Sequence, residues 1–235
     1  MMKEISIIGE AVLVKFKNEE IIDSLQSGCI YMNSLEVFRK IEKDSNDDKV
    51  GDLIDGLFHI NNGYLLLEDS AETEELVDCG LKTKYSNDYC YCFWGIGRDN
   101  YTPQFSSEQK QKMAEMGEWA LIITNLPEFI KRLLAKVEEI DAEFTCDFVS
   151  YYDPGVDSIT TIRGLIGEKG LKKVAFLKRE KYAYQQEFRF VVHVPDGTTD
   201  ELILQIGDIS DISKKIRTNN LLDSMIKTTT EFDKK

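Results

Sequence analysis

The sequence predicts one α+β domain with mixed, mostly antiparallel sheets flanked by helices. Segments in which apolar and polar residues alternate recur along the chain, and this is the period of a strand with one buried face. Between them lie segments with an apolar stripe at helical spacing. The chain has no internal repeat and no low-complexity linker, so we assign residues 1–235 to a single domain.

The first part of the chain is predicted to alternate strands with short helices. Residues 11–17 alternate and form a strand, after which Asn18 caps a helix that ends at Gly28. Residues 29–33 form a second strand, and Asn33 begins the next helix in a capping-box-like pattern.

The middle of the chain contains a hairpin signal and a buried strand. Asn61-Asn62-Gly63 lies between two apolar segments, which predicts a β-hairpin. The aromatic-rich run 89–96 predicts a central strand. A polar helix is expected to begin at Ser106 or Ser107 and to end at Gly117.

The second half of the chain carries four predicted strands and two predicted helices. The strands are expected at 119–124, 144–152, 184–194 and 201–207, and the helices at 125–143 and 219–227.

The late strand at 184–194 carries the most informative polar pattern. Phe188 and Phe190 fall on its apolar side, whereas Gln185, Glu187 and Arg189 fall on the other. Side chains on one face repeat about every 7 Å, so this face presents three long polar groups in a row. It forms either a solvated surface or the floor of a cleft.

Composition and charge exclude several classes of function. The chain has 29 basic and 42 acidic residues and a net charge of −13, which argues against general binding to phosphate backbones. No apolar run approaches the roughly 18 residues of a membrane span, and the first ten residues are too polar for a signal peptide. We therefore expect a cytoplasmic protein without a membrane partner.

Cysteine and histidine usage points the same way. The five cysteines are odd in number and have no CxxC spacing, so they are predicted to be reduced thiols of a cytosolic protein. With two histidines in the chain, a Cys/His zinc site is improbable and we predict no metal.

Short motifs along the chain resemble the ADP-ribosyltransferase superfamily, through a bacterial family linked to abortive infection. The superfamily carries a Glu- or Gln-x-Glu motif on a late strand. Members of the bacterial family begin with a Lys-containing strand, continue with a helix ending in Gly and a Tyr/Phe-x-Asn/Ser strand, and close with an aromatic residue, two spaced acids and an Arg. The matching residues here are Lys15, Gly28, Tyr31, Asn33, Ser34, Tyr182, Gln185, Glu187 and Arg189. The sequence departs from the superfamily at the first strand, where Lys15 or Lys17 stands in place of the usual Arg or His.

The resemblance implies an ADP-ribosyltransferase-like fold and an enzyme that consumes NAD and modifies a macromolecule, as a toxin or phage-defence effector. Glu187 would orient the ribose and stabilise the oxocarbenium-like cation that forms when nicotinamide leaves. Gln185 would position the acceptor, and Arg189 or Lys15 would face the phosphates. Asn33, Ser34 and Tyr91 would line the pocket. A regulatory or antitoxin partner is also implied.

Two other interpretations stay open. Glu187 and Arg189 are compatible with an ordinary solvated face in which they screen each other. Independently, the net charge of −13 favours a non-catalytic acidic binding or regulatory protein of a defence or counter-defence system, with a basic partner. A nuclease is the weaker third hypothesis, because its metal-binding carboxylates are visible only in an acidic loop.

The remaining candidates favour structural roles. Asp44, Asn46 and Asp48 partly imitate a calcium loop, but Lys49 stands where Gly is needed, so a solvated loop is the better interpretation. Cys90 and Cys92 are predicted to be buried small hydrophobes rather than nucleophiles. Neither histidine suggests a triad, and His193 is expected to be satisfied by solvent at the strand end.

Overall fold

The computed structural model describes most of the predicted elements. The described residues are 11–45, 57–60, 63–66, 73–76, 79–82, 88–97, 105–153, 175–195 and 199–224. The calcium-like positions Asn46, Asp48 and Lys49 lie outside them.

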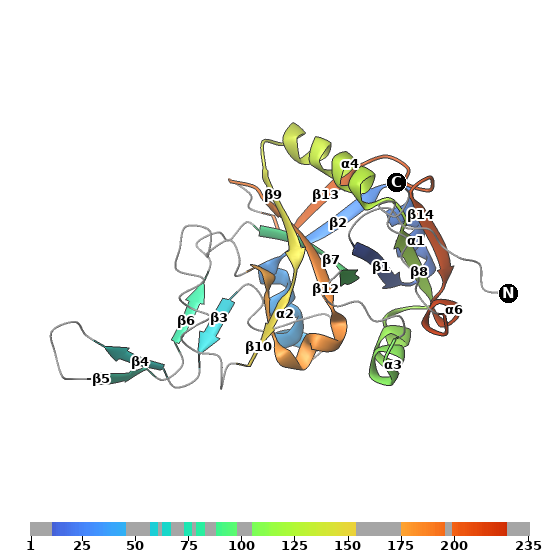
Figure 1. The fold of residues 1–235 in the computed structure, drawn as a ribbon. Coiled ribbons are helices and arrows are strands. Elements are labelled where there is room, and N and C mark those ends of the chain that lie inside the picture. The colour runs from blue at the N-terminus through green and yellow to red at the C-terminus, as the bar shows by residue number, and fades with distance from the viewer. Residues whose placement is uncertain are drawn as a thin grey trace, which may run out of the picture.

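Eight strands form one central sheet (Figure 1). Six follow the order β13 (Glu201–Gln205), β2 (Cys29–Ser34), β7 (Asp88–Gly97), β1 (Ala11–Lys17), β8 (Trp119–Ile123) and β14 (Ser213–Arg217). The other two are β12 (Glu187–His193), which pairs with β7, and β9 (Glu143–Phe148), which pairs with β12. All pairings within this sheet are antiparallel, so the predicted α+β class with a mostly antiparallel sheet is confirmed.

Helices and apolar side chains cover both faces of the sheet. The helices are α1 (Glu19–Gln26), α2 (Leu35–Ser45), α3 (Ser107–Met116), α4 (Leu126–Glu139) and α6 (Thr218–Leu222). Buried side chains of α1 and α4 join one apolar cluster with Leu13, whereas those of α3 and α6 join another with Val12 and Val14. Neighbouring residues of β1 thus face opposite sides, as the alternation predicts. In Figure 1, α4 lies above the sheet and α3 below it.

Three small sheets accompany the central one, and they correct the predicted hairpin. β3 (Leu57–Ile60) pairs with β6 (Cys79–Lys82), and β4 (Gly63–Leu66) pairs with β5 (Thr73–Leu76). The hairpin across Asn61-Asn62-Gly63 is therefore wrong, because each flanking strand pairs with a later segment instead. In the third sheet, β10 (Ser150–Tyr152) runs parallel to β11 (Leu177–Arg179), so the strand predicted at 144–152 is two strands in different sheets.

The helix ends follow their predicted signals, with one shift. The Asn18 side chain accepts the Ile21 N–H at 3.0 Å, and Gly28 follows α1 at a φ of +96°. Ser106 forms a capping box with Gln109 at the start of α3. The predicted start of α2 at Asn33 is wrong by one residue: β2 continues through Ser34, whose Oγ accepts the Val37 N–H at 3.4 Å.

The late strand is shorter than predicted. A 3₁₀ helix, η3 (Glu180–Gln185), comes first, and Gln186 then adopts a left-handed conformation with a φ of 40°. The strand begins only at Glu187, so the placement of Gln185 on it is wrong. From there the alternation is confirmed, because Phe188, Phe190 and Val192 all belong to the buried core.

The strands β5, β11 and β14 were not predicted. No helix among the described residues has both the length and the apolar character needed to cross a membrane.

Candidate active site

The central sheet splits beside the middle of β7. On one edge of β7, β1 pairs with Trp94 to Gly97 and β2 pairs with Tyr89 and Cys90. β12 pairs along the opposite edge. Neither β1 nor β2 pairs with Tyr91 to Phe93, so the two strands diverge there and leave that edge of β7 to side chains.

A cavity of about 750 Å³ lies at this split. Lys15 of β1, Asn33 of β2 and Tyr91 of β7 line it, and so do Glu187 and Arg189 of β12. Gln185 of η3 lines it as well. The polar face of the late strand is therefore the wall of a cavity and not an open solvated surface, and its volume is within the range of small-molecule sites.

Glu187 lies between two cations on the cavity wall. Its Oε1 accepts the Lys178 ammonium at 2.6 Å, and its Oε2 accepts the Arg189 Nε at 2.8 Å. The Lys178 and Arg189 side chains are only 2% and 1% exposed, so these are buried ion pairs. Burial alone would raise the pKa of Glu187, but Arg189 and Lys178 outweigh it and hold the pKa well below its ordinary 4.5.

The same two cations fix the geometry around the carboxylate. Arg189 also donates from Nη1 to the Ala175 carbonyl at 2.7 Å, and Lys178 donates to Gln185 Oε1 at 2.6 Å. Gln185 thus joins Lys178 and Glu187 from the end of η3, although it does not belong to β12. The left-handed Gln186 reverses the chain between them, which brings both side chains to one ammonium group.

Lys15 enters the split from the opposite side. Its ammonium group donates to the Cys92 carbonyl at 2.6 Å and lies 4.1 Å from the centre of the Tyr91 ring. Burial is the largest cause that lowers the pKa of Lys15, to about 8 from 10.5. At neutral pH the Lys15 ammonium is a cation beside the cavity, and it loses its proton more readily than an exposed lysine does.

Two of the predicted pocket residues differ in their surroundings. Burial raises the pKa of Tyr91, so its hydroxyl stays protonated and able to donate. Ser34 is buried under α2, where its hydroxyl caps the helix, and it does not line the cavity. All six predicted site residues other than Ser34, Tyr91 included, do line it.

The Trp94 side chain forms part of the cavity wall. Trp94 lines the cavity and is 5% exposed, and its Nε1 has no hydrogen-bond partner in the part of the chain that the structure describes. Most buried polar groups are paired, and an unpaired one costs about 1–3 kcal/mol. The atom is itself buried, so an acceptor in the cavity reaches it only if neighbouring side chains move.

Sequence reasoning missed Lys178 and Trp94. Lys178 precedes Glu187 by nine residues, and only the turn through η3 brings the two together. Trp94 falls in an aromatic run that predicts core packing, and its ring does pack on Phe105 with centroids 4.5 Å apart. A missing partner for its N–H has no signal in the sequence.

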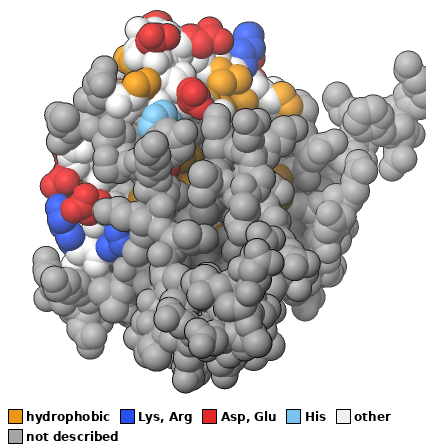
Figure 2. Space-filling model, turned by 90° about the vertical axis from the view of Figure 1, so that its left-hand side faces the viewer, with side chains coloured by type: hydrophobic (Ala, Val, Ile, Leu, Met, Phe, Trp, Pro, Cys, Tyr) orange, Lys and Arg blue, Asp and Glu red, His pale blue; other side chains and the backbone are white. Residues whose placement is uncertain are grey.

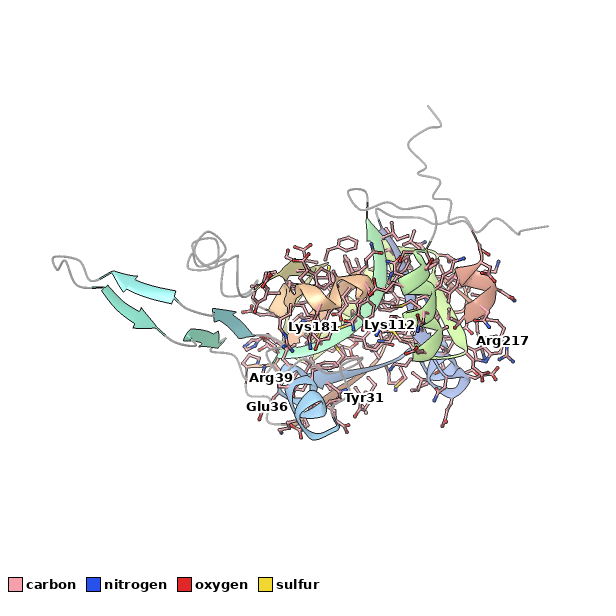
Figure 3. The ribbon with its side chains drawn as sticks, turned by 90° about the horizontal axis from the view of Figure 1, so that it is seen from below. Tyr31, Glu36, Arg39, Lys112, Lys181 and Arg217 are labelled. Carbon is pink, nitrogen blue, oxygen red and sulfur yellow. The ribbon has the colours of Figure 1, made fainter. Side chains whose placement is uncertain are left out.

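Charged side chains also surround the cavity from other elements. Lys17, Glu20 and Glu115 line it. On the underside seen in Figure 3, α3 lies against η3, and the Lys112 ammonium is 5.4 Å from the Tyr184 ring centre.

Figure 2 shows acidic side chains at the upper end of another face, where hydrophobic ones lie among them.

His193 does not line the cavity. His193 ends β12 and its Nδ1 lies 2.9 Å from Asp88 Oδ1, so a carboxylate and not solvent satisfies it. Among the described residues, no group of three or more His, Cys, Asp or Glu side chains could hold a metal ion.

Comparison of the chain with models of known protein families, with curated proteins and with solved structures found no match. Functional inference for this chain therefore depends on the cavity itself.

Proposed function

We propose that this chain is an ADP-ribosyltransferase-like enzyme that consumes NAD and transfers ADP-ribose to a macromolecule, as a toxin or phage-defence effector. The observation that carries the proposal is the gathering of Lys15, Asn33 and Glu187 around one cavity. Lys15 and Asn33 come from two successive strands at the start of the chain and Glu187 from a strand near its end, and the motif resemblance singled them out.

The charge of the cavity supports a phosphate-bearing substrate. Four basic side chains, Lys15, Lys17, Lys178 and Arg189, line the cavity with three carboxylates, Glu20, Glu115 and Glu187, so the lining carries one net positive charge. A cationic site inside a chain of net charge −13 favours an anion such as a pyrophosphate. Lys15 is the best placed to meet it, because its ammonium carries three donors and one points to the Cys92 carbonyl.

The geometry of Glu187 supports electrostatic work rather than proton transfer. Its two cations keep it ionised and fixed, so it is a poor general base. A carboxylate has about four lone-pair sites, which leaves room to accept a ribose hydroxyl. Fixed negative charge beside the sugar stabilises the oxocarbenium-like cation that forms as the bond to nicotinamide breaks.

The test is nicotinamide release from NAD, with transfer of labelled ADP-ribose in a cell lysate. Glu187→Gln should lose at least about a hundredfold in rate, the size of a lost electrostatic contact. Glu139→Gln is the matched control, since that carboxylate is an exposed partner of Lys136. Lys15→Met, which leaves the Glu187 ion pairs intact, should weaken NAD binding in calorimetry. Equal rates for wild type and Glu187→Gln, or activity in neither, would reject the proposal.

The net charge favours a second candidate, a non-catalytic protein that binds a basic partner. Such a complex should weaken steeply as salt rises, because its attraction is electrostatic. Pull-down of a basic protein at low salt that is lost at high salt, by wild type and Glu187→Gln equally, would support this candidate. Retention that does not change with salt would count against it.

A further inference from the structure

Two thiols lie side by side in the cavity wall. Cys90 and Cys92 project from the same face of β7, and their Sγ atoms are 3.5 Å apart. Both line the cavity, Cys90 at 1% exposure and Cys92 with more of its surface open. The predicted burial therefore holds fully for Cys90 and partly for Cys92, and both side chains also line the cavity.

The backbone places this pair at the limit of disulfide geometry. Two residues of an antiparallel strand span about 6.8 Å, and the Cα atoms of disulfides are separated by roughly 4.4–6.8 Å. The split in the sheet eases the contraction that closure needs. On the edge of β7 that faces the split, strand pairing stops at Cys90, so at Cys92 β12 is the only described strand that pairs with β7.

We propose that Cys90 and Cys92 form an oxidisable dithiol that senses hydroperoxides within the cavity. The Cys92 thiolate, the more accessible of the two, attacks one oxygen of the peroxide, which gives a sulfenic acid and releases hydroxide or alkoxide. The Cys90 thiolate then attacks the Cys92 sulfur, the S–S bond forms and hydroxide leaves. The two thiols lose two electrons and the peroxide gains them.

Closure of this disulfide changes the cavity. The Cys92 carbonyl is the acceptor for Lys15, and Cys92 lies directly across the ladder from Arg189. Drawing the two sulfur atoms together shortens β7 at that point and displaces both contacts. The dithiol is thus a site of oxidative control over whatever ligand the cavity holds, and its chemistry does not depend on that ligand being NAD.

The same pair fits a trivalent arsenical, which two adjacent thiols bind together. Phenylarsine oxide condenses with two thiols, forms two As–S bonds and releases one water. A single thiol does not hold the reagent against competing monothiol. This reagent therefore distinguishes a dithiol from two independent cysteines without any oxidation.

The experiment uses the full chain with Cys29→Ser, Cys79→Ser and Cys146→Ser, which retains only the pair. Hydrogen peroxide should remove two hydrogens from its intact mass, reversibly with dithiothreitol, and should abolish alkylation of both thiols. Phenylarsine oxide should add one phenylarsenic group that survives excess monothiol. The matched control carries Cys90→Ser as well and should gain oxygen and lose the arsenical.

Two outcomes would overturn the proposal. One is oxidation that adds oxygen to the paired variant without loss of two hydrogens, or that links two chains. The other is equal arsenical retention with and without Cys90. If the triple substitution fails to fold, peptide mapping of oxidised wild-type protein decides the question instead, because only a bond between Cys90 and Cys92 supports the proposal.

Discussion

Glu187 is held as an anion by its neighbours, which ties the stability of the protein to the chemistry of the cavity. Its two buried cations need the carboxylate as their counter-charge. Removal of one partner of a buried ion pair leaves an uncompensated charge and usually costs about 3–5 kcal/mol. A residue placed here for function is thus also structural, so every activity test at this position needs a folding measurement beside it.

Glu187→Gln should lower the free energy of unfolding by about 3–5 kcal/mol at neutral pH, because Lys178 and Arg189 both lose their counter-ion. Urea denaturation measures this. The double variant Lys178→Met/Glu187→Gln should lose less than the sum of the two single variants, since one stranded cation is gone. Additive losses would mean that the pair is not energetically coupled.

The pH dependence of stability follows from the same carboxylate. Its folded pKa lies below its ordinary 4.5, so the unfolded chain binds more protons in the interval between the two values. The contribution is present above about pH 4.5 and is lost as the pH falls toward the folded pKa. Wild type should therefore lose stability more steeply than Glu187→Gln as the pH is lowered from about 5 to about 3 in urea titrations.

Lys15 affects stability at alkaline pH, whereas Glu187 does so at acid pH. Its folded pKa of about 8 lies below the ordinary 10.5, so between these values the unfolded chain holds a proton that the folded chain has released. Stability should rise with pH across this interval, and Lys15→Met should remove that part of the rise. Isotope-labelled dimethylation and NMR titration should locate one lysine near pH 8. A titration near 10.5 for every lysine would contradict the burial of its charge.

Trp94 offers a test of occupancy that spares the ion pairs. Trp94→Phe keeps an aromatic ring but removes the N–H, which has no hydrogen-bond partner among the described residues. If a ligand acceptor pairs that group, the variant should bind NAD about fivefold to 140-fold more weakly, as the loss of a buried hydrogen bond of about 1–3 kcal/mol requires. Calorimetry measures it, and unchanged affinity would place the ligand elsewhere in the cavity.

At the scale of elements, the local signals predicted structure wherever a single segment determines it. The alternation in residues 11–17 and the Ser106 capping box each specify their element without distant contacts. The hairpin at Asn61-Asn62-Gly63 and the start of the late strand failed, because strand pairing and the left-handed turn at Gln186 depend on partners elsewhere.

The candidate site divides in the same way. The polar face with Glu187 and Arg189 follows from a period of two, and the motif resemblance pointed to Lys15 and Asn33. The contribution of Lys178 could not be predicted, because it requires the fold of η3 and the parallel pairing of β10 with β11. The split of the sheet depends on where β1 and β2 stop pairing with β7, and no local sequence pattern predicts this.

The turn that connects α1 to β2 gives a prediction at this scale. Gly28 has a φ of +96°, and an added Cβ would lie 2.0 Å from the Gly207 carbonyl oxygen. Gly207 also has a positive φ, +80°, but a Cβ there would meet nothing within 4 Å. Gly207→Ala should cost about 1–2 kcal/mol for its backbone conformation alone. Gly28→Ala should cost more than about 3 kcal/mol because backbone must also move.

Denaturant titration of the two glycine variants checks this difference. Equal losses would mean that the contact between the two turns gives way easily. That contact joins the start of β2 to the end of β13, since the Ile206 N–H donates to the Gly28 carbonyl at 2.9 Å. If Gly28→Ala costs more, the substitution should also displace β2 and with it Asn33, which lines the cavity.

At the scale of the whole molecule, the cavity is built by segments from both ends of the chain. β1 contributes Lys15 and β12 contributes Glu187, and β7 lies between them. A ligand that contacts all three strands binds only the folded chain. Its binding free energy is therefore added to the stability of the fold as a whole.

NAD at about a hundred times its dissociation constant should raise the free energy of unfolding by about 2.7 kcal/mol. For a domain of this size that corresponds to a rise of about 5–10 °C in the melting temperature. Lys15→Met and Trp94→Phe should show smaller shifts at the same concentration, because each alters a residue that lines the cavity, whereas Glu139→Gln should shift as wild type does. Differential scanning calorimetry measures all four. An identical shift in every variant would show that the nucleotide stabilises the protein from outside the cavity, and no shift at any concentration would leave the cavity to another anion.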